Sequence, residues 1–442
     1  ENYRAMMDAA QKNCDDAMQA DALNHLLTVQ GTIGDVPDAD AQLERARQLA
    51  RKLNDPELIA RATWNVGLAV RFSAPARAIE YHLQALQLAR AANLPELAGF
   101  CLLDLANEMQ MAGNWRGAYQ HGGEGLEIFR ARDNLPMLAN ALGARAIILY
   151  GRGETRGARA AAEEGAHISA QIENPWGEGY NEWTLIGIEI DAADFTRAFE
   201  RVERAVRSNQ VLGVPLFHGL TDLWMARAYL ELNQLERAAE IAERGGRALK
   251  QMHAPIWDTL AVGTWSRALI RQKKFNAAHK LLDPLTENFA RAENNLWGYS
   301  VSAPAITELA LAEKRFDDAQ KFADAFLAIF EREEALGYAA ELYYLRAQSF
   351  LARGELENAE RDLQRAQEIS TRAEKNILLW RVDAARADIF AARGDDARAV
   401  LARQSAAEIV RGIAAKIVDD KLRDSFLAQE EVRGLLRGDK PG

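Results

Sequence analysis

Five polar side chains recur at one position of a pattern that repeats about every 40 residues. Asn107, Arg227, Arg267, Glu308 and Gln348 each follow a small residue, and the last four are separated by 40, 41 and 40 positions. A guanidinium forms paired hydrogen bonds with planar groups such as carboxylates. A surface that carries Asn107, Arg227 and Arg267 therefore suits a carboxylate or a peptide backbone. The spacing predicts a binding surface.

The motifs that would carry catalysis or hold a cofactor are absent from the sequence. Gly122-Gly123-Glu124-Gly125 has the glycines of a phosphate-binding loop, but no Lys-Ser/Thr follows it. None of the seven histidines forms a His-Glu-x-x-His pair, and no serine lies in a Gly-x-Ser-x-Gly turn. The carboxylate pairs Glu163-Glu164 and Glu333-Glu334 are interpreted as solvated helix faces. We predict no enzyme, no cofactor and no metal site.

An internal repeat explains the spacing of the polar side chains. Small residues that would open the second helix of a hairpin recur at steps of 39 to 41 residues: Ala39, Ala78, Ala118, Ala158, Ala198, Ala238, Ala278, Ala319, Ala359 and Ala399. A series of prolines keeps the same period: Pro56, Pro95, Pro136, Pro175, Pro215 and Pro255. Proline suits the first turn of a helix, where no partner is needed for an N–H. Two series in phase predict stacked hairpins, because one hairpin cannot bury its apolar face alone.

The stretch Met225–Gly246 shows the repeating unit most clearly. Its order, small–x2–aromatic–x8–Ala–x3–small–x2–small, is carried by Ala226, Tyr229, Ala238, Ala242 and Gly245. This order resembles the tetratricopeptide repeat over roughly residues 15 to 415. The period departs from the usual length of about 34 residues. It is similar to the subgroup found in bacterial signal-transduction (STAND) ATPases and cyclases, including regulators of the MalT type, and the tail IAAKIVDDKLRDSFLAQEEVRGLL resembles the segment that ends such arrays.

The resemblance implies an all-α protein, a right-handed α-solenoid superhelix of about ten helix hairpins with a short capping segment. We expect a linking or frayed helix at 1–14, the repeat domain at 15–415, and capping helices with a polar tail at 416–442. The alanine-rich composition and the absence of alternating β-branched runs agree with this fold class.

In the resembled family the first helix of each hairpin lines the concave side of the stack. The implied groove contacts are the recurring polar position and the positions four and seven residues before it. They give ten candidates: Phe100, Asn107, Asn140, Tyr180, Trp183, Arg227, Arg267, Glu308, Tyr344 and Gln348. Aromatic residues and arginines dominate binding energy at interfaces, so Tyr180, Trp183, Arg227 and Arg267 are the main ones. Two alternatives stay open: Trp183 is a core residue, or the arginines pair with Glu308 and other neighbours and leave a solvated face.

Charge and cysteine content restrict the partners. The 54 basic and 64 acidic residues give a net charge of −10, which disfavours direct binding to nucleic acid. Cys14 and Cys101 lie in different repeats, so we expect no disulfide and a cytoplasmic protein. No apolar run reaches the roughly 18–20 residues of a membrane span. The chain begins at Glu1 without a signal-like segment, and we interpret this start as a cut inside a longer protein, with processing as the alternative.

Three functional hypotheses follow. The first is a sensor or scaffold module of a larger bacterial signalling protein, which binds a protein, peptide or small ligand in its groove and acts on an attached NTPase or cyclase. The second is a stand-alone adaptor that assembles protein complexes. The third is the inducer-sensing array of a MalT-type transcription regulator, for which a helix-turn-helix would have to follow the array. The period, the tail and the internal-looking start favour the first.

Overall fold

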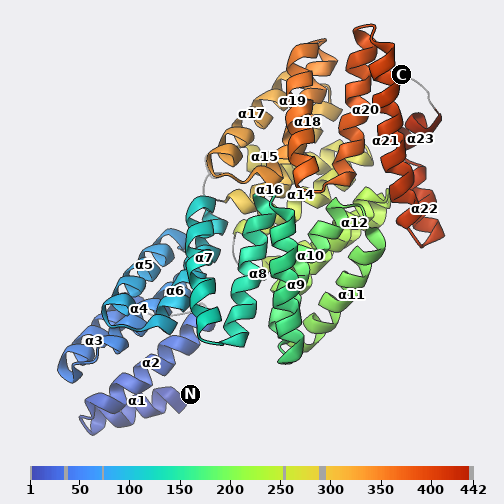
Figure 1. The fold of residues 1–442 in the computed structure, drawn as a ribbon. Coiled ribbons are helices and arrows are strands. Elements are labelled where there is room, and N and C mark those ends of the chain that lie inside the picture. The colour runs from blue at the N-terminus through green and yellow to red at the C-terminus, as the bar shows by residue number, and fades with distance from the viewer. Residues whose placement is uncertain (1, 34–37, 72–73, 252–254, 288–294, 438–442) are drawn as a thin grey trace. The chain divides into compact units, whose positions relative to one another are not determined.

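The computed structural model describes residues 2–33, 38–71, 74–251, 255–287 and 295–437. Within these ranges the chain forms twenty-three α-helices and no strand (Figure 1). The predicted all-α class is confirmed. Glu1 and the polar tail at 438–442 lie outside the described residues.

Contacts between residues divide the chain into two compact units, residues 1–145 and 146–442. The helices of the first unit are α1 (Asn2–Lys12), α2 (Asp16–Ile33), α3 (Ala39–Leu53), α4 (Pro56–Val70), α5 (Pro75–Ala91), α6 (Pro95–Ala112), α7 (Trp115–Ala131) and most of α8 (Leu135–Gly151). α1 is not a free extension, because its Met7 packs in a core with Leu23, Leu27 and Leu58 from α2 and α4.

The second unit contains the end of α8 and the remaining helices. These are α9 (Thr155–Gln171), α10 (Pro175–Asp191), α11 (Phe195–Leu212), α12 (Pro215–Glu231), α13 (Leu235–Lys250), α14 (Pro255–Arg271), α15 (Phe275–Glu287), α16 (Leu296–Ala312), α17 (Phe316–Arg332), α18 (Leu336–Ala352), α19 (Leu356–Arg372), α20 (Asn376–Ala392), α21 (Asp396–Lys416), α22 (Asp420–Leu427) and α23 (Glu430–Arg437). From α2 to α21, successive helices pair into the ten predicted hairpins.

The two sequence series set the ends and the spacing of these helices. The prolines begin α4, α6, α10, α12 and α14, and Pro136 is the second residue of α8. The small residues allow close helix contact: a Cβ on Gly245 of α13 would lie 2.9 Å from the carbonyl oxygen of Gly219 on α12. Gly113 ends α6 with φ 94°, a left-handed conformation that glycine adopts without strain. Local rules therefore explain each hairpin.

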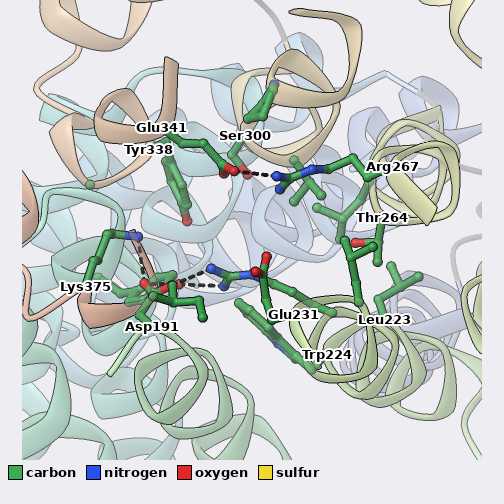
Figure 2. Close-up of a pocket in the computed structure, with 18 of the residues that line it drawn as sticks. Asp191, Leu223, Trp224, Glu231, Thr264, Arg267, Ser300, Tyr338, Glu341 and Lys375 are labelled. Carbon is green, nitrogen blue, oxygen red and sulfur yellow. Dashed lines mark hydrogen bonds and ion pairs between the residues drawn. The ribbon is translucent and has the colours of Figure 1, made fainter. Parts of the chain in front are cut away.

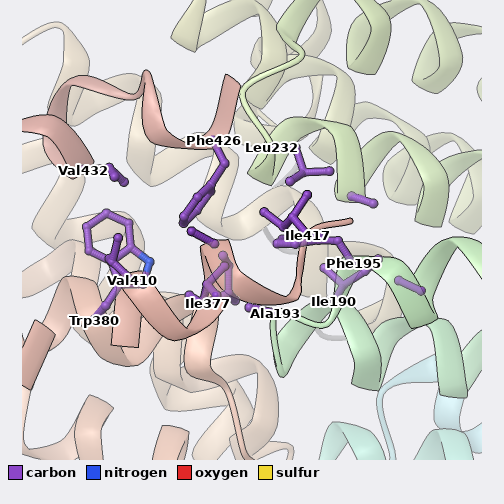
Figure 3. Close-up of a cluster of buried hydrophobic side chains, with 14 of the residues drawn as sticks. Ile190, Ala193, Phe195, Leu232, Ile377, Trp380, Val410, Ile417, Phe426 and Val432 are labelled. Carbon is purple, nitrogen blue, oxygen red and sulfur yellow. The ribbon is translucent and has the colours of Figure 1, made fainter. Parts of the chain in front are cut away.

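The early and late hairpins of the second unit contact each other. One buried apolar cluster joins Phe195 of α11 and Leu232 after α12 to Trp380 of α20, Val410 of α21 and Phe426 of α22 (Figure 3). Because these residues lie about 180 positions apart and more, the second unit closes on itself.

Hydrogen bonds between turns reinforce this closure. The Thr155 hydroxyl donates to the Ala373 carbonyl at 2.9 Å, and the Thr196 hydroxyl donates to the Lys416 carbonyl at 2.8 Å. The Gln429 amide, between α22 and α23, donates to the Glu231 carbonyl at 2.9 Å. The C-terminal helices thus pack across two distant parts of the second unit as well as on the last hairpin.

Candidate functional site

A cavity of about 120 Å³ lies inside the second unit (Figure 2). The residues that line it stand on the first helices of seven successive hairpins, α8, α10, α12, α14, α16, α18 and α20, with Lys375 just before α20. Its apolar wall includes Ile147, Trp183, Leu220, Leu223, Trp224, Leu260, Trp297, Val301, Pro304, Tyr338, Ile377 and Leu378. Self-closure of the unit therefore turns the inner face of the array into an enclosed site.

Asp191 is the centre of the first charged cluster in the cavity wall. Its carboxylate accepts hydrogen bonds from the Tyr150 hydroxyl at 2.8 Å, from Lys375 Nζ at 2.6 Å and from Arg227. Burial alone would raise the pKa of Asp191, but Arg227 and Lys375 outweigh burial and hold this pKa below its ordinary value. One buried carboxylate thus serves two cations.

Glu231 is the centre of the second charged cluster. Its carboxylate accepts from both terminal nitrogens of Arg381, at 3.2 and 3.1 Å, and lies 3.9 Å from Arg271. Burial would raise the pKa of Glu231, yet the surrounding arginines, Arg381 first, lower it to about 2. This carboxylate is therefore ionised at every ordinary pH.

Arg267 joins two carboxylates on the opposite wall. Its Nε donates to Glu308 at 2.7 Å, and a terminal nitrogen donates to Glu341 of α18 (Figure 2). Arg271, one helical turn later, also donates to Glu308, at 3.3 Å. The alternative in which arginines pair across repeats therefore describes these contacts, although Arg227 pairs with Asp191 and only Arg267 with Glu308.

Two further features shape the wall between the charged clusters. The Trp224 ring lies against α10 where Gly187 leaves space, because a Cβ there would be 2.7 Å from the ring edge. Thr184 is 2 % exposed and lines the cavity, and its hydroxyl has no hydrogen-bond partner within the described part of the chain. A buried hydroxyl without a partner costs free energy, so this atom is suited to meet a ligand.

The structure brings three of the ten candidates to the cavity wall, namely Trp183, Arg227 and Arg267. Glu308 lies behind Arg267 through their ion pair. Tyr180 packs edge-on against the Trp183 ring, with centroids 5.5 Å apart. Trp183 is itself only 5 % exposed, so it is a core residue with one edge on the cavity.

The other five candidates do not line the cavity. Tyr344 and Gln348 are half-buried on α18. Phe100, Asn107 and Asn140 belong to the first unit, where the Phe100 ring stacks on Trp64 and tilts against Phe129.

Sequence reasoning missed the residues that complete the charged clusters. Asp191, Glu231 and Arg271 stand four positions after the recurring polar position, one turn further along the same helix face. That register was the signal that could have identified them. Lys375 has no such signal, because it precedes α20 and reaches Asp191 only through closure of the unit.

Two general properties concern the described helices and side chains. No helix in the described ranges is both long and apolar enough to cross a bilayer. No three His, Cys, Asp or Glu side chains among the described residues gather in a way that could hold a metal ion.

Comparison with known proteins identifies the fold. No family model and no curated protein matches the chain. The crystal structure of a Rap protein complexed with competence and sporulation factor matches with a TM-score of 0.60 and 13 % identity, over 81 % of this chain and 98 % of that one. Yeast Tom70 and the APC/C hetero-tetramer Cut9–Hcn1 match at 10 % identity over 99 % of this chain and 96 % and 95 % of theirs, with TM-scores of only 0.38 and 0.37. At this identity the first match shows the fold alone, and the chain has the tetratricopeptide-type helical-repeat fold.

Proposed function

We propose that the second unit is a non-catalytic recognition module that binds a ligand in its interior cavity. The observation that carries this proposal is the convergence of seven first helices on one cavity with aromatic walls and charged ends. Ligand sites in proteins commonly combine an apolar lining with a few placed polar groups. The unpartnered Thr184 hydroxyl supports the same reading.

The size of the cavity restricts what enters it. An apolar protein cavity of about 150 Å³ holds benzene, whereas sites for drug-sized ligands span about 300–1,000 Å³. A cavity of about 120 Å³ therefore accepts a group of roughly one ring. A small ligand fits this volume, and a longer peptide or protein segment would require the unit to open. An extended peptide lying along a concave groove is for this reason the less favoured partner.

The wider role is also a proposal. The 40-residue period and the C-terminal tail favour a cytoplasmic sensor module of the kind that regulates an attached NTPase or cyclase in a bacterial signalling protein, and this makes the MalT-type inducer-sensing array a related alternative. A Rap protein of the same fold was solved in complex with competence and sporulation factor, which agrees with a binding role. The stand-alone adaptor would instead bind a protein on its outer surface, and changes in the cavity would leave that binding intact.

Thermal-shift screening of the purified chain against a library of small acids, amines and neutral ring compounds tests the proposal. We expect at least one compound to raise the unfolding midpoint and to change tryptophan emission, because Trp183, Trp224 and Trp297 line the cavity. The Arg267→Met variant should lose this response, whereas Arg244→Met, which removes an exposed arginine paired with Asp222 on the second helix of its hairpin, should keep it. A library without a single stabilising compound would contradict the proposal.

A further inference from the structure

We propose that the ligand of this cavity is a small monoanion, an organic acid with one ring-sized apolar group. This inference rests on the proposed function and specifies the ligand class of the same site. Three observations carry it: the charge balance of the wall, the sharing of Asp191 by two cations, and the position of the aromatic side chains.

The cavity wall carries one more cation than it has carboxylates. The cations that line it are Arg227, Arg267, Lys375 and Arg381, and the carboxylates are Asp191, Glu231 and Glu341. The side chains directly behind them, Arg271 and Glu308, cancel each other and leave the difference unchanged. Glu431 comes within 3.7 Å of Arg381, but its side chain is 66 % exposed and stands in solvent.

An uncompensated charge in a buried wall is costly, because water no longer solvates it. A ligand with one negative charge restores neutrality, whereas a cationic ligand doubles the imbalance. Among the titratable groups that line the cavity, Tyr150 and Tyr338 do not supply the missing negative charge, since burial raises both of their pKa values. The charge balance therefore selects an anion.

The excess charge is located beside Asp191. Arg227 and Lys375 both bind this one carboxylate, so the two cations together keep one unit of positive charge. An ammonium group has three donors, and one hydrogen bond from Lys375 Nζ is used by Asp191. The ligand carboxylate belongs at this end of the cavity.

The ring of the ligand belongs between the aromatic walls. Trp183 and Trp224 stand on α10 and α12, and Trp297 stands on α16. Thr184 lies seven residues before Asp191 on α10, roughly 10 Å along the helix axis. A polar atom on the far side of the ring would therefore meet the unpartnered Thr184 hydroxyl.

Three probes of nearly equal shape test the charge preference: phenylacetate, phenylacetamide and 2-phenylethylamine. Calorimetric titration of the full chain, with tryptophan emission as a second readout, should show phenylacetate binding at least about tenfold more tightly than the amide, with no binding of the amine. In addition, 4-hydroxyphenylacetate should bind more tightly than phenylacetate, and Thr184→Val should remove this difference.

The Lys375→Met variant provides the decisive comparison. It leaves three cations and three carboxylates on the wall, so the amide should bind at least as tightly as phenylacetate. Lys321→Met, an exposed change on the second helix α17, should keep the preference for the anion. If Lys375→Met does not fold, the three probes on the unmodified chain still decide the question.

The outcomes separate this inference from the proposed function. Equal or tighter binding of the amide or the amine to the unmodified chain overturns the charge inference and leaves the cavity as a ligand site. Tighter binding of the peptide acetyl-Gly-Gly-Phe than of phenylacetate overturns the size argument. Absence of binding by every probe overturns the inference, and the library screen then decides the proposed function independently.

Discussion

Gly337, in the first turn of α18, meets Tyr150 of α8 at the closest backbone contact of the closure. A Cβ on Gly337 would lie 2.5 Å from the Tyr150 carbonyl oxygen and 2.8 Å from that of Gly151. The Tyr150 and Tyr338 rings meet edge-on beside this contact, with centroids 6.1 Å apart. The absence of a side chain at one position thus allows two helices nearly 190 residues apart in sequence to touch.

Gly337→Ala should destabilise the chain, because a methyl group would strike main-chain oxygens that cannot move aside as a side chain can. Overpacking of this kind costs roughly 1–3 kcal/mol in unfolding free energy. Urea denaturation followed by circular dichroism measures this cost. The control is Gly412→Ala on α21, where a Cβ meets nothing within 4 Å and alanine should be neutral or stabilising. Equal stability of both variants would show that the contact is not close.

Asp191→Asn should be far more destabilising than Lys375→Met. Loss of the carboxylate leaves Arg227 and Lys375 buried without their anion, at a cost of roughly 3–5 kcal/mol. Loss of the ammonium leaves Asp191 with Arg227 and Tyr150, and it removes an excess charge, so its cost should be at most roughly 1.5–3 kcal/mol. Chemical denaturation at pH 7 compares the two, and the reverse order would contradict the assignment of Asp191 as the shared anion.

Acid sensitivity should depend on Glu231. Its pKa is about 2 in the folded chain and about 4.5 when unperturbed, so between these values the unfolded chain binds the extra proton. The contribution of Glu231 to stability is therefore complete above pH 4.5 and is lost as the pH falls toward 2. Glu231→Gln should lower stability at pH 7 and flatten the pH dependence below 4.5. Urea denaturation across this range should show no such flattening for Glu368→Gln, an exposed change on α19.

A buried pair in the first unit should make that unit sensitive to alkaline pH. His82 Nδ1 lies 2.8 Å from a Glu108 oxygen, and Nε2 lies 3.1 Å from the Trp64 carbonyl, which can only accept a hydrogen bond. Burial lowers the pKa of His82, but Glu108 outweighs it and the pKa is raised overall. The pKa of Glu108 is also raised, chiefly by burial. The pair therefore retains a proton that the unfolded chain releases at lower pH.

The sign of the effect follows from these directions. A histidine with a raised pKa stabilises the fold below its unperturbed value of 6.5, and this stabilisation is lost as the pH rises through the folded pKa. Hydrogen exchange of the full chain, corrected for the intrinsic pH dependence, should show α4 and α6 losing protection between pH 6 and 9. His82→Gln should abolish that loss, and an unchanged profile in the variant would exclude the pair as its origin.

The sequence by itself determined the hairpins. Pro175, Pro215 and their equivalents place the first helical turns, and small residues such as Gly245 set the distance between paired helices. Both are short-range rules that act within one repeat or between neighbours. The same periodicity singled out Trp183, Arg227 and Arg267, because a residue on the inner face of one first helix has equivalents at the same offset in the next.

The tertiary structure alone decided that the second unit closes and that its inner face is a small cavity. Closure depends on the sum of small rotations between successive hairpins, and no single repeat encodes that sum. Lys375 and Asp191 are 184 residues apart, and neither shows its partner in the sequence. The polar positions predicted for an open groove therefore became buried ion pairs, since closure removes water from charges that an open surface would leave solvated.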